Sequence, residues 1–501
     1  MSETVIGITT WGSPWHVYPD NYRWRDVEYV YADDTMCRVS SRTTLSLISR
    51  CVSSLFRRFI VIVPSTVVFD PGLSSYDKLI QHIEEIYRRF IEEEIKKTEN
   101  LSIENLDLII APSAGKFSNR YRRDYSENEL RLDYCGSISN FYHYVYSELS
   151  RILAKEILDI LEKQDPEKSL LKIILDLSHG INYMPVLTYR AVKDLVGTAS
   201  AFLGNNVALK VLNSEPVDVS RRDMNKTTIH VVEEIRSPRP EPFSIKKSER
   251  LLRLEGRCLR RDLEDAREIR EKLEEEENKI LELAGVKNID EIAIFASSIE
   301  NGYPLLTLAT IPQNIDLESI IVKLREVFHR FTRLSKRGDS EIEVRYLARY
   351  TINTSNLIKS LMIAEIIEKG LEIHRRSEAS LREIKRITEC LWGLYRDKRI
   401  KIAREIYSIK NMIIRGKDVY CDGSYRKLYE AIDQETSEET CRYIEKEEDR
   451  FERNLIAHAG FERCVTEFKC LEDDEDKIYL RYSEQHLNRV KEIVLKQVQE
   501  T

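Results

Sequence analysis

Four short apolar segments in the first half of the chain constrain its fold more than any other feature. They lie at residues 5–11, 59–65, 106–113 and 172–178. Because they are apolar at nearly every position, they are typical of parallel strands that helices cover on both faces. Amphipathic segments such as residues 76–97 and 141–163 separate them, and this alternation predicts a doubly wound α/β fold over residues 1–235. Two later apolar runs, residues 206–213 and 228–235, are predicted to add edge strands.

Three prolines between residues 236 and 243 interrupt this pattern and indicate a linker. Beyond them, apolar residues at three- and four-residue spacing predict one long amphipathic helix over residues 244–285, which Gly285 ends. Residues 286–345 have a mixed pattern that we interpret as a small inserted or wing-like module. From residue 346 to 501 the pattern is nearly all helical and predicts an all-α bundle. Its predicted helices are 352–376, 378–414, 423–456 and 484–499. The expected division of the chain is 1–235, 236–345 and 346–501.

The composition narrows the class of protein. A chain of 501 residues is too long for one ordinary core, and a net charge of −7 leaves no global basic field for duplex DNA. The charged fraction of 33%, with abundant Glu, Lys and Arg, leans toward a thermophile. Neither a membrane span nor a signal peptide is recognisable, so we expect a cytoplasmic protein that does not bind membranes.

The 9 cysteines are scattered without any C-x-x-C pair. An odd count without a spacing pattern argues against both a disulfide framework and a zinc site. Free thiols in a reducing cytoplasm fit this pattern best.

Each of the four strands is followed by a loop of unusual composition. The loops are residues 11–24, 65–72, 112–120 and 178–185. In an open parallel sheet, ligands bind outside the carboxyl ends of the strands, near the point where the strand order reverses. The small residues, hydroxyls, amides and aromatic rings of these loops suit phosphates and bases. Neither a G-x-G-x-x-G nor a G-x-x-x-x-G-K-[ST] motif occurs, which disfavours dinucleotide and P-loop sites.

The most specific of these loops has the sequence LDLSHGINYMP, residues 175–185. Asp176 ends the strand, and Gly180 permits a tight turn. The other polar side chains of the loop are those of Ser178, His179 and Asn182. By itself, this segment fits a ligand-binding loop and a polar turn with a helix cap equally well.

A strand that ends in Asp-x-Ser/Thr-His-Gly-x-Asn resembles the signature of CARF domains, the Rossmann-like sensor domains of CRISPR-associated proteins. The segments TTWGSP (9–14) and PSAGKF (112–117) are similar to their counterparts there. The resemblance implies a dimer that binds a cyclic oligoadenylate, expected to be cyclic tetra-adenylate, across its two-fold axis. A ring of four adenylates is itself close to two-fold symmetric, so two copies of one patch can hold it. The residues implied to line this site are Trp11, Gly12, Ser13, Gly115, Ser178, His179, Gly180 and Asn182.

A second candidate site is the segment RNLIAHAG, residues 453–460. Histidine exchanges protons near neutral pH, and the arginine fork suits phosphate oxygens. RNA carries its own nucleophile, the 2′-hydroxyl, so a proton shuttle and a cation are sufficient for its cleavage. Five residues on a regular helix turn by about 140°, so Arg453 and His458 do not lie side by side. Either the helix ends or bends within the motif, where Gly460 is suited to end it, or the pair meets at a seam between subunits.

RNLIAHAG resembles the R-x4–6-H motif of HEPN ribonucleases, which are helical bundles that dimerise so that both copies of the motif line one cleft. The resemblance implies that Arg453 and His458 are catalytic and that Asn454 helps to hold them in place. A CARF sensor followed by a HEPN bundle is the arrangement of ancillary ribonucleases of type III CRISPR systems. The resemblance covers residues 1–235 and 346–501.

This family implies a metal-independent endoribonuclease of antiviral defence that cleaves single-stranded RNA. Cyclic oligoadenylate is expected as its allosteric activator, with no other cofactor, and the protein is expected to be at least a homodimer, with a higher oligomer of dimers left open. Two alternatives remain. The sensor could control a transcription regulator, with a winged helix hidden in residues 286–345. It could also degrade its own ring through Ser178 and His179.

Overall fold

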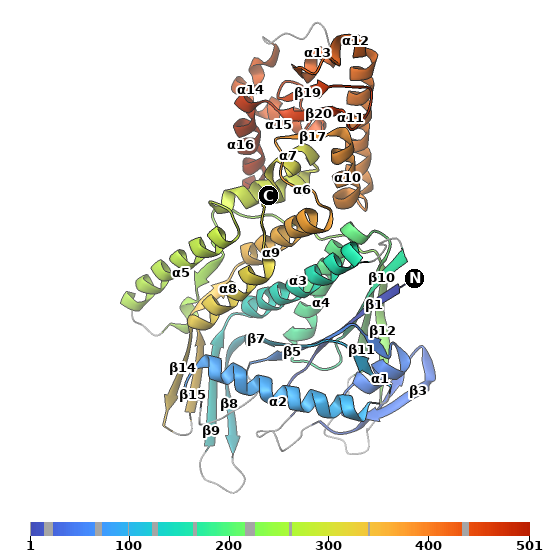
Figure 1. Ribbon diagram of the computed structural model, residues 1–501. Coiled ribbons are helices and arrows are strands. Elements are labelled where there is room, and N and C mark those ends of the chain that lie inside the picture. Colours follow the sequence, from blue (N-terminus) through green and yellow to red (C-terminus); the bar gives the residue numbers. More distant parts are fainter. Residues whose placement is uncertain are drawn as a thin grey trace.

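A computed structural model describes residues 2–14, 24–65, 73–98, 100–122, 129–163, 168–215, 226–259, 263–338, 341–432 and 440–500. The first half of the chain forms an eight-stranded sheet with the strand order β3-β2-β12-β11-β10-β1-β5-β7 (Figure 1). Its strands are β1 (Ser2–Thr10), β2 (Val27–Tyr31), β3 (Asp34–Ser41), β5 (Arg58–Pro64), β7 (Leu106–Ala111), β10 (Ser169–Asp176), β11 (Val207–Ser214) and β12 (Lys226–Arg236). Two short strands, β4 (Leu55–Phe56) and β6 (Ser102–Ile103), pair beside it.

The five adjacent strands from β11 to β7 are parallel, and the chain order reverses between β1 and β10. At this switch point Thr9 pairs with Asp176, so the loops after β1 and β10 leave the sheet side by side. Helices α1 (Leu45–Cys51) and α2 (Tyr76–Lys97) come before and after β5 in the chain, and α3 (Ile138–Lys163) and α4 (Tyr183–Leu203) come before and after β10. Figure 1 shows the two pairs on opposite faces of the sheet. The predicted doubly wound fold is therefore confirmed.

The sequence predicts that the two later strands lie at an edge of the sheet, but neither does. β11 lies between β10 and β12, and β12 pairs in parallel with β2. The edge on this side is β3, whose outer positions are largely exposed. The β2–β3 hairpin lacks the continuous apolar pattern of a doubly covered strand, which is why the sequence does not single it out.

The long helix predicted over residues 244–285 is present only in its second half, as α5 (Leu263–Leu283). In the first half, β13 (Leu252–Leu254) pairs with β16 (Ala348–Tyr350), and a 3₁₀ turn follows at Gly256–Cys258. Leu251 and Leu252 are buried in this pairing, and such tertiary contacts override helix propensity. Gly285 has φ +68° and follows the helix end, as predicted.

The mixed segment that follows holds helices and a hairpin. Its elements are α6 (Ile289–Asn301), α7 (Pro304–Thr310), α8 (Leu317–Arg330), β14 (Thr332–Arg337) and β15 (Glu341–Tyr346). The hairpin does not stand free, because β15 pairs in parallel with β9 (Glu129–Gly136) of the first half. Together with β8 (Gly115–Arg122) they form a four-stranded sheet in the order β14-β15-β9-β8.

The last part of the chain is mainly helical, as predicted. Its helices are α9 (Ile352–Glu365) with a π-helical extension (Ile366–Gly370), α10 (Leu381–Trp392), α11 (Arg396–Arg415), α12 (Lys417–Tyr420), α13 (Leu428–Ile432), a 3₁₀ turn (Thr440–Arg442), α14 (Tyr443–Lys446), α15 (Glu448–Ala457) and α16 (Glu484–Glu500). The predicted helix 423–456 is broken into several of these pieces. Among the described residues, no helix is long and apolar enough to cross a membrane.

An antiparallel sheet that the sequence did not predict lies among these helices, in the order β17-β20-β19-β18. Its strands are β17 (Glu378–Ser380), β18 (Tyr425–Lys427), β19 (Thr466–Cys470) and β20 (Ile478–Tyr482). The two longest strands alternate between buried and half-buried residues. They occupy the stretch between the last two predicted helices, where short period-two segments are harder to recognise than helices.

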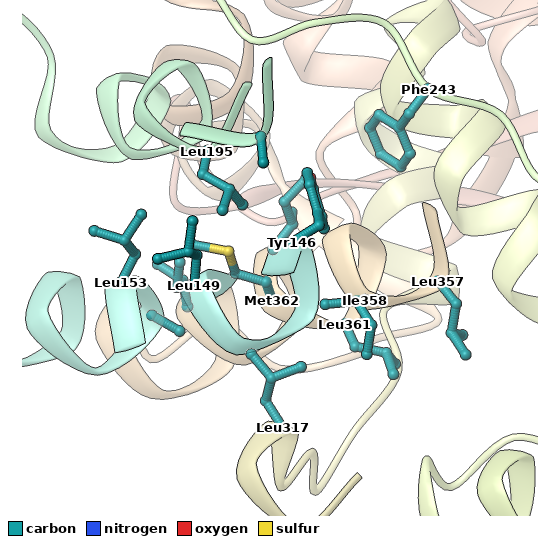
Figure 2. Packing of buried hydrophobic residues seen from close by; sticks show 14 of the residues in the cluster. Tyr146, Leu149, Leu153, Leu195, Phe243, Leu317, Leu357, Ile358, Leu361 and Met362 are labelled. Carbon is teal, nitrogen blue, oxygen red and sulfur yellow. The ribbon is translucent and has the colours of Figure 1, made fainter. Parts of the chain in front are cut away.

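The two halves of the molecule share a core. Figure 2 shows Tyr146 and Leu149 of α3 and Leu195 of α4 packed toward Ile358 and Met362 of α9. Burying apolar side chains from helices that lie far apart in sequence joins them into one unit. A buried ion pair lies in the same region, because Lys359 of α9 donates to Asp194 of α4.

The cysteines correct the sequence analysis. Eight of them form disulfide bonds: Cys37–Cys51, Cys135–Cys258, Cys421–Cys470 and Cys441–Cys464. Only Cys390 is free. The two cysteines of each disulfide are 14 to 123 residues apart, so no local spacing pattern predicts the pairing. The expectation of free thiols was therefore wrong, because the tertiary fold decides which cysteines meet.

Candidate functional site

The carboxylate of Asp176 organises the sheet edge at the switch point. Its Oδ2 accepts hydrogen bonds from Oγ1 of Thr9 at 3.0 Å and from Oγ1 of Thr44 at 2.6 Å. Its Oδ1 accepts one from the backbone N–H of Ser178 at 3.1 Å. Three donors around a carboxylate that is 1% exposed satisfy the buried charge and hold the loop after β10 in one conformation.

The imidazole of His179 is held between two aromatic side chains. Its Nε2 lies 3.1 Å from the hydroxyl oxygen of Tyr29, and the ring stacks on Trp24 with centroids 4.7 Å apart. Burial lowers the pKa of His179, and the neighbouring carboxylate of Asp176 opposes this shift only in part. The imidazole is therefore neutral near pH 7 and can offer a ligand a hydrogen bond but not a full charge.

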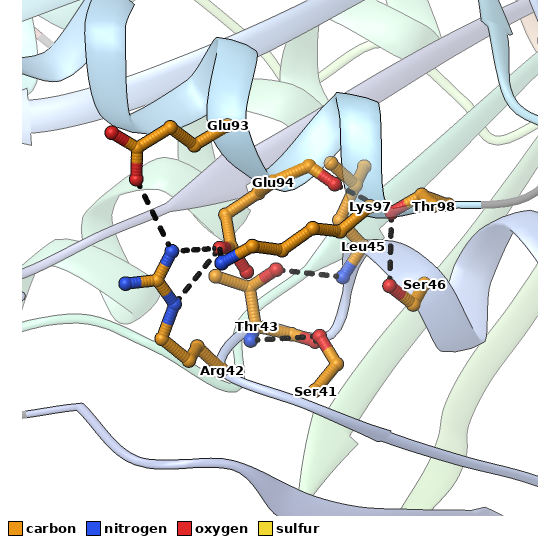
Figure 3. Close-up of polar contacts among 9 residues, drawn as sticks. All are labelled: Ser41, Arg42, Thr43, Leu45, Ser46, Glu93, Glu94, Lys97 and Thr98. Carbon is orange, nitrogen blue, oxygen red and sulfur yellow. Dashed lines mark hydrogen bonds and ion pairs between the residues drawn. The ribbon is translucent and has the colours of Figure 1, made fainter.

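The side chain of Trp11 lies beneath the loops. It is 1% exposed and packs edge-on against Trp24 and Phe90, with centroid distances of 5.9 and 5.8 Å. Arg42 covers the other side of Phe90 and forms an ion pair with Glu94 (Figure 3). The indole thus supports the ring that stacks on the histidine. That Trp11 lines a ligand site stays a prediction. Because its side chain is covered, Trp11 could contact a ligand only through its backbone.

Two of the predicted glycines bring the loops after β1 and β10 together. A Cβ atom on Gly180 would lie 2.8 Å from Oγ1 of Thr10, closer than packed atoms allow. Gly180 is therefore required for close approach between backbone and strand. A Cβ atom on Gly12 would lie 3.7 Å from Cγ1 of Ile181, so the two loops are in contact.

The other predicted ligand residues lie at the same edge. Gly115 is exposed with φ +93° and begins β8, so the loop expected over residues 112–120 is shorter than predicted. The loop is tied to α4, because the N–H of Ala114 donates to the Tyr183 hydroxyl at 3.3 Å. Asn182 is the exposed cap residue of α4 and makes no side-chain cap hydrogen bond, and Ser13 is half-buried.

Three buried polar atoms at this edge lack a hydrogen-bond partner within the described residues. They are Oγ1 of Thr10, Nε1 of Trp11 and Oγ of Ser178. Leaving such an atom unpaired costs about 1–3 kcal/mol, so a ligand that supplied a partner to the hydroxyl of Thr10 or Ser178 would gain that energy.

The second candidate site begins where α15 ends. His458 caps the helix with φ −103°, and Ala459 and Gly460 follow with φ +50° and +82°. The N–H groups of Ala459 and Gly460 donate to the carbonyls of Ile456 and Leu455, which closes the helix in a Schellman-type turn. The prediction that the helix ends or bends within the motif is confirmed.

Arg453 and Asn454 point to different surroundings. Arg453 is exposed and forms no ion pair within the part of the chain that the structure describes. Nδ2 of Asn454 donates to the Tyr443 hydroxyl at 3.2 Å, and that hydroxyl donates to Glu462. Glu462 is 1% exposed and also accepts the N–H of Cys464 at 2.8 Å. Asn454 therefore ties α15 to the segment that follows it.

A carboxylate on α11 contacts the motif histidine. Nδ1 of His458 lies 3.2 Å from Oε2 of Glu405. This hydrogen bond raises the pKa of His458, and partial burial opposes the rise. A cavity of about 570 Å³ opens beside Ala457 and is lined mainly by α11. His458, whose pKa is raised, therefore lies next to a cavity that basic side chains of α11 line.

Several residues of both sites were not predicted. Tyr29 and Thr44 complete the surroundings of the first loop, and Glu405 and Tyr443 those of the second. None of these four belongs to a motif, whereas Trp24 lies at the end of the predicted loop 11–24. Only the position of Tyr29 in a short aromatic strand could have drawn attention to it.

Comparisons with known proteins identify both regions. A family model for the CARF domain of the CRISPR system endoribonuclease Csx1 matches residues 6–216, and a model for its HEPN domain matches residues 396–484. The Csx1 protein of Methanocaldococcus jannaschii is 28% identical over 444 residues, which cover 84% of this chain and 82% of that protein. The chain belongs to the Csx1 family of CRISPR-associated CARF–HEPN proteins. Asp176 and His179 lie within the CARF match, and Arg453 and His458 within the HEPN match.

The HEPN match begins at the first residue of α11, and residues 217–395 lie between the two matched regions. Among the described residues, no group of three or more His, Cys, Asp or Glu side chains is arranged to hold a metal ion.

Proposed function

We propose that the protein is a metal-independent endoribonuclease that cleaves single-stranded RNA when a cyclic oligoadenylate, expected to be cyclic tetra-adenylate, binds its CARF domain. The observation that carries this proposal is the position of His458. It lies just beyond the end of α15, within the matched HEPN region, beside a basic cavity. The division into a sensor (1–235), a middle segment (236–345) and a nuclease (346–501) is part of the proposal.

In the proposed reaction the 2′-hydroxyl of the RNA attacks the adjacent phosphate. His458 moves the proton, and Arg453 stabilises the negative charge that develops on the phosphate oxygens. The products are a 2′,3′-cyclic phosphate, or a 3′-phosphate after its hydrolysis, and a 5′-hydroxyl. Five residues along a helix turn by about 140°, so Arg453 and His458 do not lie side by side on α15. We therefore propose that a second copy of the chain completes the site at a two-fold seam. A monomer is then inactive, and the active protein is a homodimer or an oligomer of dimers in the cytoplasm.

For ring binding, the switch point offers groups of the right kind. The unpartnered hydroxyls of Thr10 and Ser178 can donate to phosphate oxygens, and the neutral His179 can bond to a base or ribose.

The middle segment is suited to carry the signal. Tyr303, at the start of α7, packs against Gly460, where an added Cβ atom would lie 3.0 Å from the Cβ of Tyr303. At the other end, β15 lies in one sheet with β9 of the sensor. Ring binding would shift the population of these packed elements toward the active arrangement.

The alternative of a DNA-binding regulator is disfavoured by the surroundings of α8. The order of α6, α7, α8 and the hairpin is that of a winged helix. However, basic side chains of α8 are paired within the protein: Lys323 and Arg330 with Glu276, and Arg325 with Glu148. A recognition helix would need such side chains free for DNA.

The test is cleavage of a labelled single-stranded RNA in EDTA, with and without cyclic tetra-adenylate or cyclic hexa-adenylate. We expect cleavage that depends on a ring, survives EDTA and is lost in His458→Ala. Loss of activity in EDTA would refute metal independence, and equal activity without a ring would refute the sensor role. Following the labelled ring over hours in His458→Ala protein tests ring degradation, because disappearance of the ring there would assign a second activity to the CARF domain.

A further inference from the structure

Helix α11 holds the end of α15 in place. Nζ of Lys401 donates to the carbonyl oxygen of Ile456, one of the last carbonyls of α15. This carbonyl also accepts the N–H of Ala459, and because it lies at the negative end of the helix dipole, a cation is favourable there. Burial lowers the pKa of Lys401, and Glu405 opposes this shift. The contact fixes the backbone two residues before His458.

One turn along the same helix, Glu405 contacts the imidazole itself. Oε2 of Glu405 lies 3.2 Å from Nδ1 of His458, and the two side chains are 25% and 49% exposed. A carboxylate on Nδ1 fixes the orientation of the ring and leaves Nε2 as the nitrogen that can exchange a proton with a substrate.

The charged groups around His458 act in both directions. Glu405 of α11 and Glu462 of the following segment favour the imidazolium, and Arg463 disfavours it. Lys401 lies on the same face of α11 as Glu405, one turn away. The direct hydrogen bond from Glu405 has the largest effect, so the pKa of His458 is raised.

The cavity beside this pair suits a phosphodiester. Arg396 and Arg404 line it, are exposed and form no ion pair within the described ranges. An RNA phosphate in this cavity would therefore meet cations without first breaking an ion pair.

We propose that Glu405 is a positioning residue of the nuclease site, which orients His458 so that its Nε2 faces an RNA phosphate in the cavity lined by α11. This inference rests on the proposed ribonuclease function. It adds a carboxylate–histidine pair to the arginine–histidine motif and places the substrate against α11.

The experiment measures ring-activated RNA cleavage as a function of pH for the whole protein. In Glu405→Gln, the amide keeps the shape but loses the charge, so we expect kcat to fall at least about 10-fold with little change in KM. The limb of the pH–rate profile that reports His458 should move to lower pH, because the group that raises its pKa is gone. Glu405→Asp keeps the carboxylate and should restore part of kcat and the original position of that limb.

Glu389→Gln is the matched control, since Glu389 is an exposed glutamate of α10 and its removal changes the net charge equally. It should leave both kcat and the pH profile unchanged. An unchanged profile and rate in Glu405→Gln would overturn the proposal. Ring binding measured on each variant confirms that it is folded. If His458→Ala still cleaves RNA, the proposed function itself fails, and that outcome is distinct from an inert Glu405.

Discussion

The hydroxyl oxygen of Tyr346 lies 2.6 Å from Oγ of Ser65, although 281 positions separate the two residues in the chain. Tyr346 ends β15 in the middle segment, and Ser65 follows β5 of the sensor sheet. The same hydroxyl lies 3.4 Å from the backbone nitrogen of Ser113, after β7. The buried side chain of Tyr346 thus joins β15 to the ends of β5 and β7, where two of the predicted ligand-binding loops begin.

Removing this hydroxyl should weaken the coupling between sensor and nuclease. In Tyr346→Phe, we expect the ring concentration for half-maximal RNA cleavage to rise about 2- to 10-fold, because a buried hydrogen bond contributes roughly 0.5–1.5 kcal/mol. Dose–response curves with cyclic tetra-adenylate measure this. Tyr350→Phe is the control, because its hydroxyl donates to the carbonyl of Leu324 in α8 and not to a loop after a sheet strand. Equal curves for the two variants would contradict the coupling role.

The hydrogen bond between Tyr29 and His179 predicts a specific loss of ring affinity. In Tyr29→Phe the imidazole keeps its stacking on Trp24 but loses the partner of its Nε2. The dissociation constant of the ring should rise about 2- to 10-fold, while cleavage at saturating ring stays near the wild-type rate. Calorimetric titration measures the affinity. Tyr31→Phe on the same strand removes a hydroxyl bonded to Asp33 and should leave the affinity unchanged.

The turn after His458 should not tolerate a side chain. Gly460 combines φ +82° with close contacts to Tyr303 and Tyr482, at 3.0 and 3.1 Å from an added Cβ. We expect Gly460→Ala to lower the free energy of unfolding by roughly 1–3 kcal/mol and to reduce RNA cleavage. Gly338→Ala shares a positive φ of +64° but meets nothing within 4 Å, so it is the control for the backbone cost. Urea unfolding compares the two, and an equal effect would mean that the contacts contribute nothing.

The ion pair of His458 predicts a pH dependence of stability. Its pKa in the folded protein is raised above the ordinary value of 6.5, so the added stability is fully present below that value. It is lost as the pH rises through the higher folded pKa. Thermal unfolding of Glu405→Gln should therefore show a deficit relative to wild type at pH 5.5 that disappears by about pH 9. A deficit of constant size across this range would argue against the ion pair.

The disulfide bonds predict the thiol chemistry of the purified protein. Denatured without reductant, each chain should expose a single reactive thiol, that of Cys390. Reduction should lower the unfolding midpoint, because loops of 23 and 49 residues closed by Cys441–Cys464 and Cys421–Cys470 contribute about 3–4 kcal/mol each. Thiol labelling with mass spectrometry checks the count, and nine reactive thiols per chain would contradict the pairing.

The amino-acid pattern alone was sufficient for the doubly wound sheet, for its helices such as α2, and for the two motifs. Strand and helix periodicity is local, so residues 59–65 and 76–97 carry their own signal. The loop at Ser178 and His179 and the helix end at Gly460 are likewise readable, because turns and caps depend on neighbouring residues. The two family resemblances rested on these short segments.

The tertiary structure decided what no local pattern encodes. Residues 252–254, which the sequence predicts as helix, pair with β16 as a strand. β12, which the sequence predicts at an edge, lies inside the sheet because β2 pairs with it. The partners of the key side chains, such as Glu405 for His458 and Tyr29 for His179, lie 53 and 150 residues away. Contacts of this kind depend on how complete elements pack, and packing is a property of the whole chain. The sequence could therefore point to His458 as the candidate histidine, but only the fold could place the carboxylate of Glu405 beside it.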